Sequence, residues 1–136
     1  MSIVQTVCTS AKADMLTALA AHTLRMALYT SSANLDAATG VYLTSGEVVG
    51  SGYTAGGAVL TGVVVHSEGV VAFLDFDDVV WTNSTITARA ALIYDSTNAG
   101  KSIAVLDFGA DKTSSGTPLT VQIPLATATT SLIRIQ

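Results

Sequence analysis

Two alternating stretches joined by a turn dominate the pattern of apolar and polar positions. In the first stretch, Ile86, Ala88, Ala90 and Leu92 face one way, because successive side chains of a strand alternate. The turn, residues 95–100, contains Asn98 and Gly100, and both residues tolerate positive φ. Residues 102–108 then return with side chains that suit a half-buried pleated surface. The pattern predicts a hairpin over residues 84–109 that lies centrally in its sheet, with the rest of the chain packed around it.

Shorter runs predict the remaining strands. They cover residues 24–29, 58–66, 69–76, 79–81, 117–125 and 131–136. We expect the second and third of these runs to form a hairpin turned at residues 67–69, and Trp81 to anchor the core. Pro124 has no N–H to donate, so its strand should end at an edge or a bulge. Apolar residues in the last run predict a C-terminus tied into a sheet.

A single helical pattern covers residues 10–22, with Ser10 as its predicted N-cap. Its apolar stripe consists of Ala11, Met15, Leu16, Leu19 and Ala20, while Lys12 and Asp14 lie off that stripe. His22 ends the helix, and we expect it to cap the helix or to face solvent.

Two segments lack a regular pattern. Residues 1–9 suggest an edge strand or an extended arm, and residues 30–57 form a long glycine-rich loop. Such a long loop is usually functional or ordered by a partner. Residues 52–57 could suggest a phosphate cradle, but no basic residue follows them and no helix opens there. We therefore interpret this stretch as a mobile or docking loop.

These elements predict the fold class. A chain of 136 residues can bury one core, and about seven strands with one N-terminal helix indicate a mainly β protein. We expect a single domain over residues 1–136, built as an antiparallel β-sandwich or barrel.

Composition adds a prediction about the surface. Charged residues make up 12% of the chain, against roughly 25% in ordinary soluble domains. A surface of hydroxyls, alanines and glycines with few charges is prone to association. We therefore expect much of it to be buried in an assembly.

Charge and cysteine content exclude several classes. The net charge is −4 and the six basic residues are scattered, so no nucleic-acid partner is expected. Neither a signal peptide nor a run of 18 apolar residues is found, which predicts a protein made in a cytoplasm without a membrane partner. Cys8 is the only cysteine, so it forms no intrachain disulfide and is expected to be a small buried residue.

No catalytic motif stands out. A nucleophile–base–acid set needs a histidine near a hydroxyl or thiol and a carboxylate, and His22 and His66 lie in no such motif. The aromatic residues fall mostly at strand-core positions, which disfavours a carbohydrate-binding platform. The chain is therefore predicted not to be an enzyme and to use no cofactor.

Carboxylates are the remaining candidates for chemistry. Asp75, Asp77 and Asp78 could coordinate calcium, but their spacing departs from that of an EF-hand loop. Paired carboxylates for glycoside hydrolysis could come from Glu68, Asp75, Asp77 or Asp107. Aspartates at strand ends are more often simple turn formers, so we expect no metal and no hydrolase site.

Five segments, taken together and in this order, carry a family resemblance. They are ALYTSSANL at 27–35, GEVVGSGYTAGG at 46–57, VVAFLDFDDVVWTN at 70–83, TARAALIY at 87–94 and VLDFG at 105–109. The set resembles a family of small virion structural proteins from tailed bacteriophages and prophages, and the similarity covers nearly the whole chain beyond about residue 24.

The resemblance implies a particle component assembled in the cytoplasm of a host bacterium and located in the virion. Our leading hypothesis is a capsid decoration or cement protein that binds the major capsid protein or another virion protein as a homo-oligomer, with a trimer favoured. The expected assembly interface consists of Ile3, Val4, Val7, Gly52, Tyr53 and Thr54. A tail, neck or baseplate component is the first alternative, and a host-surface or glycan-binding module is the second.

Overall fold

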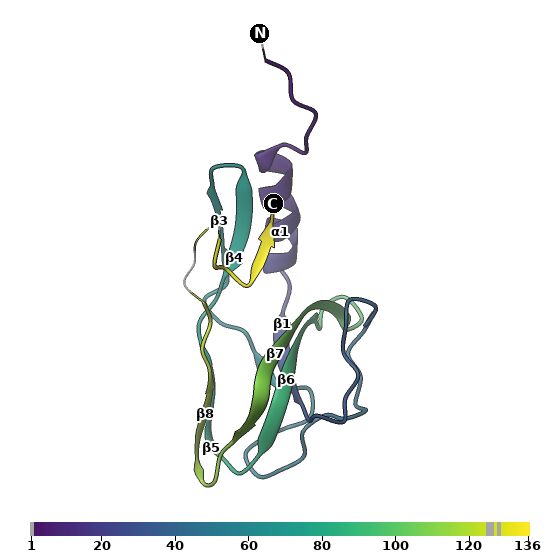
Figure 1. Cartoon of the computed structure of the whole chain (residues 1–136), viewed down its shortest axis with the longest axis vertical. Helices are drawn as coiled ribbons and strands as arrows, with labels where there is room; N and C mark the ends of the chain where they lie inside the picture. The colour runs from purple at the N-terminus through teal and green to yellow at the C-terminus, as the bar shows by residue number, and fades with distance from the viewer. Residues whose placement is uncertain (1, 125–126, 128) are drawn as a thin grey trace.

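The computed structural model describes residues 2–124, 127 and 129–136, and these residues form one helix and three antiparallel sheets (Figure 1). The elements are α1 Thr9–Ala20, β1 Leu24–Tyr29, β2 Ala58–Val59, β3 Val64–Glu68, β4 Val71–Asp75, β5 Val79–Ser84, β6 Thr87–Asp95, β7 Lys101–Thr113, β8 Thr117–Val121 and β9 Ile133–Ile135. The strand orders are β2-β1-β6-β7, β3-β4-β9 and β5-β8. The predicted mainly β fold with one N-terminal helix is confirmed. The described strands form a sandwich-like arrangement and no closed barrel.

The four strands β5 to β8 form one long ribbon that bends sharply in the middle. β5 pairs with β8 and β6 with β7, and the register runs from Ser84↔Thr117 on one side of the bend to Thr87↔Thr113 on the other. At the bend, the hydroxyls of Ser84 and Ser114 lie 2.7 Å apart, and both side chains are buried. Because two buried hydroxyls satisfy each other there, the chain can turn without orphaned polar groups.

The predicted hairpin is confirmed as β6 and β7, but only half of it is central. β6 lies between β1 and β7, whereas β7 is the last strand of its sheet. The predicted central position is therefore wrong for β7. The physical reason is the bend, which carries the next segment, β8, away to pair with β5.

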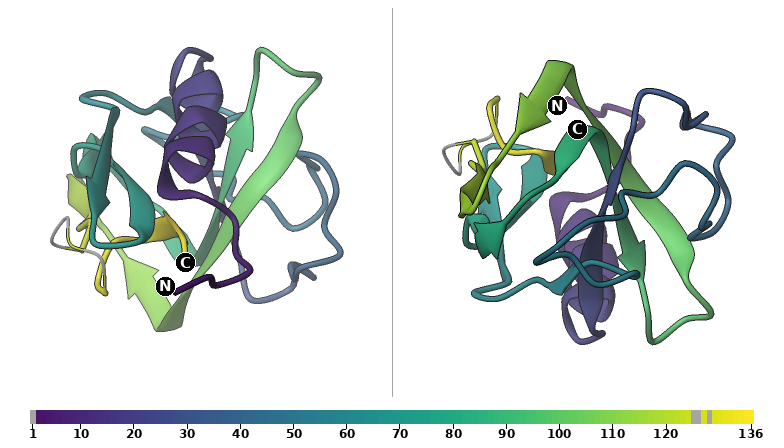
Figure 2. Two further views of the ribbon diagram at one scale, coloured as in Figure 1. Left: turned by 90° about the horizontal axis from the view of Figure 1, so that it is seen from above. Right: turned by 90° about the horizontal axis from the view of Figure 1, so that it is seen from below.

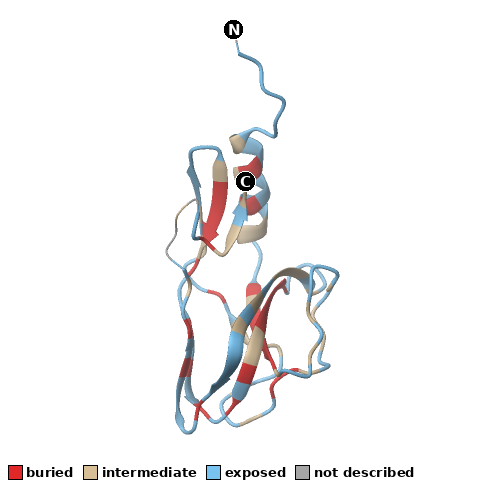
Figure 3. Ribbon diagram, in the orientation of Figure 1, coloured by how far each residue is buried: buried red, intermediate tan, exposed pale blue. Residues whose placement is uncertain are grey.

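β1 and β6 are buried on both faces. Met26, Leu28 and Ile93 belong to the main core, which joins residues from all three sheets, while Tyr29 and Leu92 belong to a second cluster on the opposite face. Ala33, Leu35, Tyr42 and Leu43, all from the loop 30–57, pack against that second cluster. The expectation of a mobile loop or one ordered by a partner is therefore wrong, because this loop covers one face of the sheet. Figure 3 shows that buried residues follow these strands.

The second predicted hairpin is partly correct. β3 and β4 pair as expected, but β2 pairs with β1 in the other sheet. The segment 58–66 is broken near Gly62, which has a φ of 65°.

The predicted C-terminal strand is confirmed, since β9 pairs with β4. The predicted strand 117–125 ends earlier, at Val121, and residue 125 lies outside the described residues.

The helix packs against β3 and β4, as Figures 1 and 2 show. It starts at Thr9 with Cys8 as its N-cap, so the predicted Ser10 cap is wrong. Its buried residues are Lys12 and Leu16, whereas Met15 is 53% exposed. The predicted stripe is therefore wrong at Ala11 and Met15, which are exposed, and Lys12 faces inward instead, where its amine donates a 2.8 Å hydrogen bond to the Val70 carbonyl.

Candidate functional site

The N-terminal arm, residues 2–8, is the most exposed apolar segment of the chain. It lies outside the helix and the strands, and Figure 1 shows it projecting away from α1. Ile3 is 81% exposed, Val4 75% and Val7 54%. Cys8 is exposed too, so its predicted burial is wrong, because the helix begins just after it and leaves the thiol in solvent.

The arm carries no charged side chain, and its residues 2–8 are all exposed. The one side-chain hydrogen bond among its described residues joins the Thr6 hydroxyl to the neighbouring Val7 carbonyl. Removing apolar surface from water stabilises a complex by about 25 cal/mol per Å². Three exposed apolar side chains on an extended segment therefore favour a partner that covers them.

The glycine-rich part of the expected interface looks different. Gly52 and Thr54 are exposed, but the Tyr53 side chain turns inward against Trp81, with ring centroids 6.0 Å apart. Gly52 has a φ of 85°, and a Cβ there would lie 2.1 Å from the Asn83 carbonyl oxygen. A partner could therefore contact the backbone and Thr54 at this point, but not the Tyr53 ring.

The expected interface residues lie in two places. Figure 1 shows the arm leaving one end of the elongated molecule, whereas the loop around residues 52–54 lies beside β1 and β6 in the other half. Within one copy, the structure does not bring the two groups together. A single partner surface would have to be extended, or two different neighbours would have to contact them.

Glu47, which sequence reasoning missed, organises the loop. Its buried carboxylate accepts hydrogen bonds from the hydroxyls of Tyr42 and Tyr53, at 2.7 and 2.6 Å, and from the N–H of Gly56 at 2.8 Å. Burial raises the pKa of both tyrosines above the ordinary value, and the hydrogen bonds to Glu47 raise it further. The only signal in the sequence is an acidic residue between two tyrosines in a stretch with few charges.

Two more tyrosines fasten the same loop. The Tyr29 hydroxyl donates a 2.6 Å hydrogen bond to the Leu43 carbonyl, and the Tyr94 hydroxyl a 2.6 Å bond to the Gly56 carbonyl. Burial raises the pKa of Tyr29 to about 12, because the charged phenolate would be poorly solvated there. These contacts are structural and hold the loop against the sheet.

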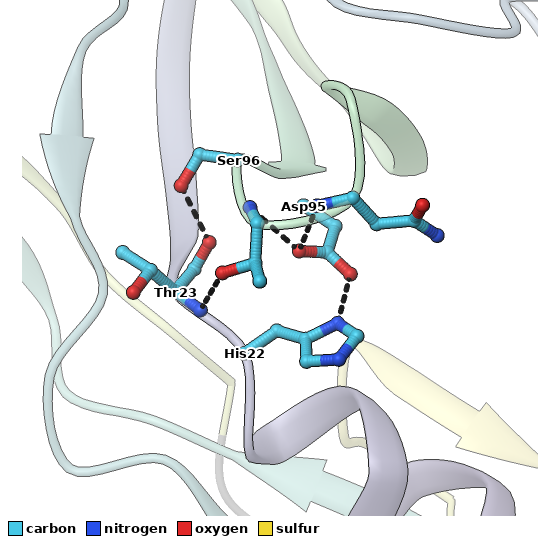
Figure 4. A network of polar contacts seen from close by, with 6 residues as sticks. His22, Thr23, Asp95 and Ser96 are labelled. Atoms are coloured by element: carbon cyan, nitrogen blue, oxygen red, sulfur yellow. Dashed lines mark hydrogen bonds and ion pairs between the residues drawn. The ribbon is translucent and has the colours of Figure 1, made fainter.

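His22 pairs with Asp95, 2.5 Å away between Nδ1 and Oδ2 (Figure 4). The expected solvent exposure of His22 is confirmed, since its side chain is 38% exposed, but the imidazole also contacts a buried carboxylate, which was not expected. Oδ1 of Asp95 also accepts hydrogen bonds from the N–H groups of Thr97 and Asn98. The pair resembles two members of a catalytic triad, but among the described residues no hydroxyl or thiol bonds to the other ring nitrogen. Its evident effect is to tie the end of the helix to the β6–β7 turn.

Three of the acidic candidates, Asp77, Asp78 and Asp107, have separate partners. Asp77 accepts a hydrogen bond from the Thr61 hydroxyl at 3.0 Å, and Asp78 accepts one from the Ile123 N–H at 2.7 Å. Asp107 accepts hydrogen bonds from the Gly109 N–H and from Arg89, and these lower its pKa. In the part of the chain that the structure describes, no three acidic, histidine or cysteine residues gather to hold a metal ion.

An open groove lies between β7 and β8. It has a volume of about 800 Å³, and its apolar lining includes Leu106, Phe108, Leu119, Val121 and Leu132.

None of the described helices is long and apolar enough to span a membrane. The sequence matches no protein-family model, no curated protein and no solved structure.

Proposed function

We propose that this chain is a structural protein of a tailed-phage virion, a decoration protein that binds the assembled capsid shell as a homo-oligomer. The observation that carries the proposal is the arm, in which Ile3, Val4 and Val7 are 81%, 75% and 54% exposed. The low charge of the chain and the ordered set of phage-like segments support the same assignment.

The proposed mechanism is multivalent burial. Each copy would make a modest contact with the major capsid protein or another virion protein, and the apolar arm, buried on a neighbouring chain, would add to it. Linked copies then bind with an avidity that exceeds the affinity of a single copy, because the later contacts form at a high effective concentration. A symmetric oligomer, with a trimer favoured, would bridge adjacent capsomers.

A tail, neck or baseplate component is the second candidate, and the exposed arm fits it as well. The number of copies separates the two, since a decoration protein covers the shell and a tail part does not. A glycan-binding module would need exposed aromatic rings. None of the eight aromatic side chains is exposed, which argues against that alternative.

The test measures binding of the purified protein to undecorated shells by co-sedimentation. We expect the full chain to bind and a variant lacking residues 1–9 to lose binding by at least tenfold. The substitution Val49→Ser is the matched control, because Val49 is 95% exposed but lies outside the arm. Unchanged binding of the truncated variant would contradict a role for the arm, and no binding by the full chain would contradict the decoration role.

A further inference from the structure

The cavity between β7 and β8 is a groove bordered by two open strand edges. Residues 105–108 of β7 and 119–122 of β8 all line it. Side chains of a strand alternate between its faces, so consecutive lining residues mean that the groove runs along the edges of the strands. Among the described strands, β7 pairs only with β6, and β8 only with β5.

An open edge carries backbone N–H and C=O groups that lack a strand partner. β7 has 13 residues, more than twice the usual strand length of about 5–6. At its start the edge is occupied, because Ser102 donates a hydrogen bond to the Gly40 carbonyl. Residues 103–106 contain no charge and no proline that would block pairing, but loop residues 36, 37 and 39 border residues 102–105. Residues 105–108 line the groove, and the charge of Asp107 among them is paired with Arg89. The edge from residue 105 onward is therefore the part that can accept another strand.

The arm has the complementary properties. It is extended, uncharged and apolar, and its backbone has no strand partner. In an extended segment Ile3 and Val7 point to the same side, about 13 Å apart. Leu106 and Phe108 of β7, facing Leu119 and Val121 of β8, offer an apolar surface on which two such side chains can be buried.

The arm cannot easily fill the groove of its own copy. It leaves α1 at the end of the molecule and points away from the body (Figure 1). To return, it would first have to run back along the 12 residues of the helix, about 18 Å. Seven extended residues span only about 23 Å, so little of the arm would be left to pair.

We propose that residues 2–8 of one copy add a strand to the open edge of β7 in a second copy, with Ile3 and Val7 buried between β7 and β8. This inference deepens the proposed function, because it identifies the contact that makes the oligomer assumed there. The contact is heterologous, since the arm of one copy meets the groove of the next. Such contacts close into a ring when the rotation between copies allows it.

A complementation experiment tests the inference by molar mass in solution. One variant lacks residues 2–8 and keeps the groove. The other, Val105→Glu, keeps the arm and places a charge at the groove, since Val105 lines it and is 36% exposed. Each variant alone should be a monomer near 13.9 kDa, while an equimolar mixture should form a 1:1 dimer. The full chain should form a closed oligomer.

Val80→Glu is the matched control, because Val80 is 43% exposed on β5 and lies outside the groove. It should leave the oligomer intact. An oligomer that survives in either of the two monomer variants, or a mixture that stays monomeric, would overturn the inference.

Hydrogen exchange gives a second readout that does not depend on the folding of Val105→Glu. Amides of residues 105–108 should exchange at least tenfold more slowly in the full chain than in the variant lacking residues 2–8. Equal exchange, or protection in a monomeric full chain, would contradict pairing with a second copy. A monomeric full chain that still binds shells would overturn this inference and leave the proposed function standing. An oligomer in which the arm of one copy pairs with β7 of the next, but which does not bind shells, would support the inference and contradict the proposed function.

Discussion

The Tyr53 hydroxyl donates a 2.6 Å hydrogen bond to Oε2 of Glu47 and accepts a 2.9 Å hydrogen bond from the Leu28 N–H. A single phenol thus joins the buried strand β1 to the carboxylate that organises the loop 30–57. With Tyr42 and Gly56 also donating to Glu47, the loop is held by polar contacts as well as by apolar ones. The long segment without regular structure is therefore part of the folded body.

Glu47→Ala should lower the free energy of unfolding by at least about 2 kcal/mol, because it removes hydrogen bonds to a charged group and leaves buried donors unpaired. Urea denaturation measures the loss. Glu68→Ala is the control, since Glu68 is an exposed carboxylate, and it should stay within about 0.5 kcal/mol. Equal losses for the two variants would contradict the structural role of Glu47.

Tyr29 should make the protein less stable at alkaline pH. In the unfolded chain its phenol loses a proton near pH 10, but in the folded protein only near pH 12. Between these values the unfolded state binds fewer protons, so stability falls as pH rises, by up to about 1.4 kcal/mol per pH unit for this residue.

Denaturant unfolding at a series of alkaline pH values measures this slope. Tyr29→Phe removes the titrating group, so its stability should fall less steeply over the same range. The half-buried Tyr42 and Tyr53, whose pKa values are also raised, will still contribute to both proteins. Parallel curves for the two proteins would show that Tyr29 titrates normally.

Asp95→Ala should destabilise the protein more than His22→Ala. Asp95 is 2% exposed and holds the Thr97 and Asn98 N–H groups as well as the imidazole, whereas the His22 side chain is 38% exposed. We expect about 2–4 kcal/mol for the aspartate and about 1 kcal/mol for the histidine, measured by thermal or urea unfolding. The reverse order would contradict the assigned roles.

Gly57→Ala should be among the most damaging small substitutions. Gly57 has a φ of 77°, and a Cβ would lie 1.8 Å from the Met26 carbonyl oxygen. Backbone strain and crowding together predict a loss of about 2–5 kcal/mol. Gly40→Ala is the control, because a Cβ there meets no atom within 4 Å. A stability change at Gly57 no larger than that at Gly40 would contradict the close packing of β2 on β1.

Local patterns were sufficient to predict β1, the β6–β7 hairpin and the terminal strand β9. The predicted alternation agrees with the structure in β1, but it is wrong in β6, where the register shifts between Ala88 and Ala90 so that Ala88 faces the main core and Leu92 the second cluster. The break near Gly62 was not predictable from alternation, because the apolar pattern continues across it while β2 and β3 join different sheets. Partner choice between strands depends on the whole fold.

The polar contacts were harder to predict. Lys12 and Glu47 look like solvated charges in the sequence, and only the fold places the Val70 carbonyl or the tyrosine hydroxyls beside them. The groove depends on the bend at Ser84 and Ser114. Their hydroxyls are hydrogen-bonded although the two residues are 30 positions apart in the sequence, so no local pattern reveals the contact. The N-terminal segment, by contrast, was expected to be an edge strand or an extended arm, and the structure shows the arm, with Ile3, Val4 and Val7 exposed.

The proposed shell-decorating role is tested most directly by a reconstruction of intact virions that carry this protein. A decoration protein should be present in many copies spread over the capsid, seated between capsomers, with residues 2–8 buried against a neighbouring chain. A few copies confined to the tail or a vertex, or no copy on the particle, would contradict it.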